Sequence, residues 1–134
     1  MAVKRRNGSW LTGAVALYAL ASFVHFAHNA EFLGEYPNLP GSMTRMGVYA
    51  AWLALAAIGL CGWTLYRSGW RRCGLALLGV YAALGLAGLL HYSLAPMSAH
   101  DAIMNFTIGF EAITAVVLLL AISAEVRSHR LEPI

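Results

Sequence analysis

Four long apolar runs, separated by short polar segments, make up most of the chain. Each run is close to the roughly 20 residues that an α-helix needs to cross a bilayer. None shows the alternation in ten-residue segments that a membrane β-barrel requires. The pattern predicts an all-α integral membrane four-helix bundle that forms one domain over residues 1–134. The predicted spans cover about residues 10–33, 46–66, 73–94 and 102–126.

The short segments between the runs carry residues that break or cap helices. Residues 36–42 contain two prolines and a glycine, which predicts a loop after the first span. Residues 67–69 predict a tight turn between the second and third spans. Thr44 is placed to cap the second span and Ser98 to cap the fourth, since their hydroxyl oxygens can accept from free backbone N–H groups.

The composition agrees with a membrane protein. Apolar residues make up 60% of the 134 residues and charged residues 11%, whereas soluble domains are near half apolar and about a quarter charged. Such an apolar chain is not disordered. Two cysteines, Cys61 and Cys73, do not make a disulfide scaffold. The expected surrounding of the helices is therefore a lipid bilayer.

Lysine and arginine gather on one side of the four predicted spans. Cytoplasmic flanks are enriched in these residues, so both termini are predicted to be cytoplasmic, in a membrane expected to be the bacterial inner membrane. The net charge of +3 follows from this flank and does not indicate a nucleic-acid partner. The basic residues on this side are Lys4, Arg5, Arg6, Arg67, Arg71, Arg72, Arg127 and Arg130, and Arg45 lies on the other side.

Polar residues within the spans gather toward the predicted non-cytoplasmic end. Such residues are costly inside a bilayer and usually serve function. With a rise of about 1.5 Å per residue, His25, Thr107 and Glu111 are predicted to form the deepest group. The group above it is predicted to contain His28, Asn29, His91, Met104 and Asn105. The rim residues are Glu31, Glu35, Arg45, His100 and Asp101.

These residues first indicate a metal-dependent membrane enzyme, an oxidoreductase that acts on a lipophilic or small substrate. Imidazole and carboxylate groups suit Fe, Cu or Zn, and helix bundles build such sites from facing helices. The expected ligands are His25, His28, His91 and Glu111, of which His25 and Glu111 also carry the catalysis. The side chains expected to orient these ligands are Asn29, Glu31, His100, Asp101 and Asn105.

Two other functions fit the same residues. His25 or His28 together with His91 would bind a b-type haem. The protein would then be a metal- or haem-binding subunit of a larger membrane complex, or a homo-oligomer.

The remaining alternative needs no metal, because His25 and Glu111 would act together as an acid–base pair. The order of His, acid and Pro residues through the first span and its loop resembles that of the emopamil-binding and sterol-isomerase-like membrane family. That resemblance implies an isomerase-like reaction and carries over no residue role.

Overall fold

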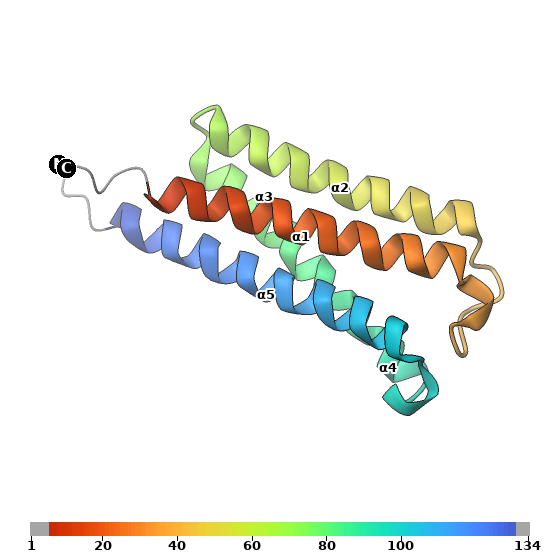
Figure 1. The fold of residues 1–134 in the computed structure, drawn as a ribbon. Coiled ribbons are helices and arrows are strands. Elements are labelled where there is room, and N and C mark those ends of the chain that lie inside the picture. The colour runs from red at the N-terminus through yellow and green to blue at the C-terminus, as the bar shows by residue number, and fades with distance from the viewer. Residues whose placement is uncertain (1–5, 131–134) are drawn as a thin grey trace.

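The computed structural model describes residues 6–130 of the chain. Within these residues, four long helical segments form a bundle in which the third segment, residues 71–94, crosses obliquely to the other three (Figure 1). The long helices are α1 (Arg6–Glu31), α2 (Arg45–Arg67), α3 (Arg71–Gly85) and α5 (Ala102–Arg130). The short elements are η1 (Leu33–Glu35), η2 (Leu86–Leu90), α4 (His91–Leu94) and η3 (Met97–Ala99).

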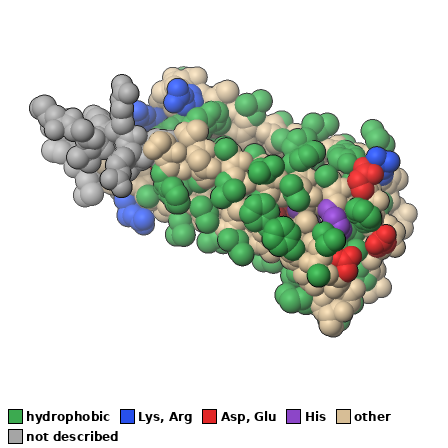
Figure 2. Space-filling view, in the orientation of Figure 1, with side chains coloured by type: hydrophobic (Ala, Val, Ile, Leu, Met, Phe, Trp, Pro, Cys, Tyr) green, Lys and Arg blue, Asp and Glu red, His purple; other side chains and the backbone are tan. Residues whose placement is uncertain are grey.

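The described residues contain four segments long and apolar enough to cross a membrane, which confirms the all-α, four-helix part of the prediction. They are Ser9–Glu31, Arg45–Arg67, Arg71–Leu94 and Ala102–Ser128. In Figure 2, the acidic side chains lie toward one end of the molecule beside a single basic group, most of the visible basic side chains lie toward the other end, and apolar side chains cover the surface between them. We call the end formed by residues 32–44 and 91–104 the site end.

One predicted helix cap is confirmed and the other is wrong. The Gly47 N–H donates to Thr44 Oγ1 at 3.1 Å, so Thr44 caps α2. Ser98 does not cap α5, because it lies inside η3 and the chain then extends through His100. Asp101 takes this role, since its Oδ1 accepts from the Met104 N–H at 2.8 Å.

The third span is interrupted, which the sequence pattern does not indicate. It changes from α-helix to 3₁₀-helix after Gly85. The Tyr18 hydroxyl donates to the Tyr81 carbonyl at 3.1 Å, which is the carbonyl that an α-helical Gly85 N–H would use. A side chain inserted in this way commonly breaks a helix. Since a 3₁₀-helix turns about 120° per residue and an α-helix about 100°, the five residues of η2 rotate the direction of His91 by about 100°.

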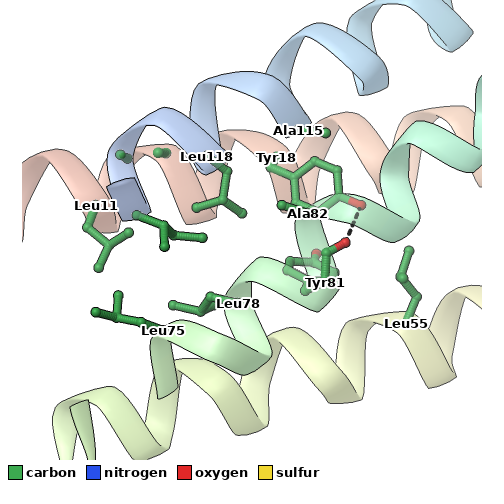
Figure 3. Packing of buried hydrophobic residues seen from close by; sticks show 12 residues of the cluster. Leu11, Tyr18, Leu55, Leu75, Leu78, Tyr81, Ala82, Ala115 and Leu118 are labelled. Atoms are coloured by element: carbon green, nitrogen blue, oxygen red, sulfur yellow. Dashed lines mark hydrogen bonds between the residues drawn. The ribbon is translucent and has the colours of Figure 1, made fainter. Parts of the chain in front are cut away.

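The apolar core lies mainly in the half of the bundle away from the site end. Figure 3 shows its side chains packed between the helices. It includes Leu11, Tyr18, Leu55, Leu75, Leu78, Tyr81, Ala82, Ala115 and Leu118. Close contact between α2 and α3 depends on glycine here: a Cβ on Gly59 would lie 2.6 Å from the Tyr81 ring, and one on Gly62 would lie 2.9 Å from the Leu78 backbone nitrogen. Nearer the site end, a cavity separates α2 from η2.

Candidate functional site

A histidine and a carboxylate meet in the interior, one from α1 and one from α5. His25 Nε2 lies 3.7 Å from Glu111 Oε2, and the two side chains are 3% and 1% exposed. Glu111 accepts no hydrogen bond of normal geometry from the described residues, although the Ser22 hydroxyl is close enough to interact with it. The structure thus brings together the two residues expected to carry catalysis.

Thr107 contacts the other nitrogen of the His25 ring, Nδ1. Its hydroxyl donates to the Met104 carbonyl at 3.1 Å, so its oxygen is the acceptor toward His25 Nδ1, which lies 3.4 Å away. With the proton on Nδ1, the unprotonated nitrogen is Nε2. It lies next to Glu111 and also next to the cavity wall, since a Cβ on Gly88 would be 3.6 Å from it. Thr107 and Glu111 are one turn apart on α5, which is why a single helix face supplies both contacts.

Asn29 and His91 form a second polar pair next to the first. Asn29 Nδ2 donates to His91 Nε2 at 3.1 Å, and the His91 ring centroid lies 5.5 Å from that of His25. Both side chains are buried. His91 Nδ1 and Asn29 Oδ1 have no hydrogen-bond partner in residues 6–130, so each retains unused hydrogen-bonding capacity.

Tyr36 folds back from the loop onto the histidines, and no sequence pattern indicated it. Its hydroxyl shares a 2.9 Å hydrogen bond with His28 Nδ1, and its ring lies 5.0 Å from that of His91 and 6.5 Å from that of His100. Burial raises the pKa of Tyr36 to about 12. The one available signal was an aromatic residue in a proline-rich polar loop, where a buried side chain is not expected.

Three of the side chains expected to orient the metal ligands hold loops and helix ends instead of the histidine rings: Glu31, Asp101 and Asn105. Glu31 Oε1 pairs with Arg45 at 2.7 Å and accepts from the Tyr49 hydroxyl. Asn105 accepts from the Tyr92 hydroxyl and donates to the carbonyls of Met97 and His100. With the cap made by Asp101, these contacts fix the site end around the buried pairs.

His100 lies among the aromatic rings of the site end. Its Nδ1–H donates to the Pro96 carbonyl at 3.1 Å, and its ring lies 6.2 Å from the His91 ring. Its Nε2 is buried without a partner in the described part of the chain. His100 therefore packs beside His91 without bonding to it.

A cavity of about 420 Å³ lies beside the two buried pairs, between α1, α2 and η2. This volume is within the range of roughly 300–1,000 Å³ usual for small-molecule sites. Its polar lining comes from His25, Asn29 and His91 inside the bundle and from Ser42 and Thr44 at the loop, and its other walls are mainly apolar. Glu111 lies just behind the wall, since a Cβ on Gly88 would be 3.0 Å from Glu111 Oε2.

The four predicted metal ligands do not form one group. His28 is engaged by Tyr36 and His91 by Asn29. Among residues 6–130, no three or more His, Cys, Asp or Glu side chains are arranged to hold a metal ion. His25 and Glu111 are the predicted ligands that face each other directly.

A buried carboxylate also lies at the opposite end of the bundle. Glu125 is 5% exposed, and the Tyr66 hydroxyl of α2 donates to its Oε1. The apolar residues Leu118 and Ile122 separate it from Glu111 along α5. It lies near the end of the fourth apolar run, and no sequence pattern singled it out.

Comparison of the chain with protein-family models, with curated proteins and with solved structures finds no match.

Proposed function

We propose that the protein is a membrane enzyme in which His25 and Glu111 transfer protons to and from a lipophilic small molecule. The observation that carries this proposal is the position of His25, between Glu111 on one side and the cavity on the other. A general base must lie within reach of the substrate and be oriented by a further group. Thr107 and Glu111 orient His25, and the cavity gives it access to a ligand.

The reaction that fits this pair is an isomerase-like proton shift. His25 takes a proton from one carbon of the substrate, the double bond moves, and the same or another proton is delivered to a second carbon. Glu111 stabilises the imidazolium formed between the two steps, as a buried carboxylate does for a neighbouring cation. The numbers of protons and electrons balance, so no oxidant or reductant is needed.

The distribution of basic residues supports an orientation in which both termini are cytoplasmic. Arg67, Arg71 and Arg127 lie at the end opposite the site, whereas Arg45 at the site end is paired with Glu31. For a protein of the bacterial inner membrane, the cavity would then lie in the half of the bilayer away from the cytoplasm.

A substrate-independent experiment tests the proton transfer. The full-length protein is reconstituted with a lipid extract of its source organism in D₂O, and the extract is analysed by mass spectrometry. We expect deuterium at a carbon position of one lipid class, and a loss of this label with His25→Gln or Glu111→Gln. Label that is equal in empty vesicles and with the wild-type protein would contradict the proposal.

A metal centre is the second candidate, supported by the proximity of two imidazoles and a carboxylate. The His25 and His91 rings are 5.5 Å apart, Glu111 is adjacent, and His91 Nδ1 and both Glu111 oxygens lack hydrogen-bond partners within residues 6–130. A metal bound there by His25, His91 and Glu111 would require movement of these side chains. Fe or Cu would then support an oxidoreductase.

Elemental analysis and visible absorption of the purified protein distinguish the candidates. A stoichiometric metal that is lost with His91→Ala supports the metal centre. A Soret band lost with the same change supports a b-haem subunit. A folded protein with neither property, but with the deuterium label, supports acid–base chemistry.

A further inference from the structure

We infer that the cavity binds a lipid with an uncharged hydroxyl headgroup, which Asn29 and His91 hold while the apolar chain leaves between α2 and η2. This inference names the substrate class for the proposed acid–base site. It rests on the proposed function in one respect: the bound lipid is taken to be the substrate.

The free atoms of the polar pair are complementary to a hydroxyl group. With Asn29 Nδ2 donating to His91 Nε2, the His91 proton is on Nδ1 and can be donated, and Asn29 Oδ1 can accept. The opposite orientation of the amide exchanges these roles and still offers one donor and one acceptor. A hydroxyl group matches this pair of atoms, since it accepts one hydrogen bond and donates one. Both side chains are at least nine-tenths buried and line the cavity.

The electrostatic surroundings favour a headgroup without charge. No Lys, Arg, Asp or Glu side chain lines the cavity among the described residues. Arg45, the basic residue of the site end, is largely exposed and engaged by Glu31. A phosphate or carboxylate would therefore be buried without a counter-ion, which is costly.

The walls near the mouth of the cavity leave room for a hydrocarbon chain. On α2 they carry Gly47 and Ala51, and on η2 they carry Ala87 and Gly88. Ala51 and Ala87 are exposed in the described structure, on helices that span the apolar zone. The cavity therefore opens sideways between two spans, where a bilayer would meet the protein, and a chain can extend from it into the lipid.

Photolabelling of the full-length protein in bilayer nanodiscs tests this inference. The probe is octadecanol with a diazirine in mid-chain, and bound label is mapped by mass spectrometry. We expect saturable labelling of α2 and η2 that unlabelled octadecanol displaces. Ala51→Leu and Ala87→Leu fill the mouth and should weaken binding about tenfold or more. Ala50→Leu and Ala83→Leu lie exposed on the same two spans outside the lining, so they are matched controls and should bind normally.

The headgroup is tested by competition and by changes to the polar pair. Asn29→Leu and His91→Phe should weaken binding of the alcohol, with folding checked by circular dichroism and by retention of the mapped labelling site at high probe concentration. Stearate, octadecylamine and phosphatidic acid should compete poorly. Equal labelling of the Ala51→Leu and Ala50→Leu variants, or stronger competition by a charged lipid than by the alcohol, would overturn the inference.

The outcomes separate this inference from the proposed function. Saturable binding that persists in His25→Gln, without deuterium exchange in the wild type, would support the lipid site and contradict the acid–base enzyme. Deuterium exchange that is unaffected by Ala51→Leu and Ala87→Leu would contradict the lipid site and leave the enzyme proposal intact.

Discussion

His25 on α1 and Glu111 on α5 lie 86 residues apart in the sequence (111 − 25), yet their side chains approach to 3.7 Å in the interior. Each group alone would be a costly polar atom in an apolar bundle. The attraction between them offsets part of this cost. We therefore expect the pair to stabilise the packing of α1 against α5.

A double-mutant cycle measures this coupling. His25→Gln and Glu111→Gln should each reduce the free energy of unfolding by about 1–3 kcal/mol, because each leaves a buried partner without its counterpart. The double variant should lose less than the sum of the two. Unfolding by SDS in mixed micelles provides the measurement.

Glu125 is the matched control for this cycle. It lies on the same helix, fourteen residues beyond Glu111 (125 − 111), or about 21 Å along the axis at 1.5 Å per residue. His25→Gln and Glu125→Gln should therefore be additive. Equal coupling of His25 to both carboxylates would contradict a specific pair.

Tyr36 should make the stability of the fold depend on pH in the alkaline range. Its pKa is raised from 10.0 to about 12 because its phenol is buried. Between these pH values the unfolded chain loses the phenol proton and the folded chain keeps it, so the unfolded state binds fewer protons and stability falls as the pH rises. Below pH 10, Tyr36→Phe should be about 1 kcal/mol less stable than the wild type, because it lacks the hydrogen bond to His28.

Thermal unfolding in detergent across this pH range checks the effect. The wild type should lose stability as the pH rises through 10, whereas the Tyr36→Phe variant lacks this contribution, so the difference between the two should shrink. A difference that stays constant over the same range would contradict a buried, protonated Tyr36.

The spans could be predicted because apolar runs of bilayer length leave few alternatives. The proximity of His25, Thr107 and Glu111 could also be predicted, since depth and helical spacing both follow from position along a span. The contacts of His28 and His91 could not. They depend on a loop tyrosine that folds inward and on the rotation introduced by η2, and both result from tertiary packing that local periodicity does not record.

Asp101 should stabilise the start of α5. Asp101→Ala removes the acceptor for the Met104 N–H and should cost about 1 kcal/mol of stability. Ser98→Ala should have little effect, because Ser98 is exposed within η3 and lies before the helix. Detergent melting curves of the two variants distinguish the caps, and a larger loss with Ser98→Ala would contradict the assignment.

Two glycines of α3 should respond in opposite ways to the same substitution. A Cβ on Gly74 would lie 2.6 Å from Tyr66 Cα and 2.7 Å from the Gly62 carbonyl oxygen, and backbone atoms cannot move aside cheaply. Gly74→Ala should therefore push α2 from α3 and destabilise the protein by roughly 1–3 kcal/mol. At Gly79 a Cβ meets no atom within 4 Å, so Gly79→Ala should be neutral or stabilise the helix by up to about 1 kcal/mol. SDS unfolding of both variants tests the packing, and a similar loss at the two positions would show that helix propensity, not the close approach of α2 and α3, decides the outcome.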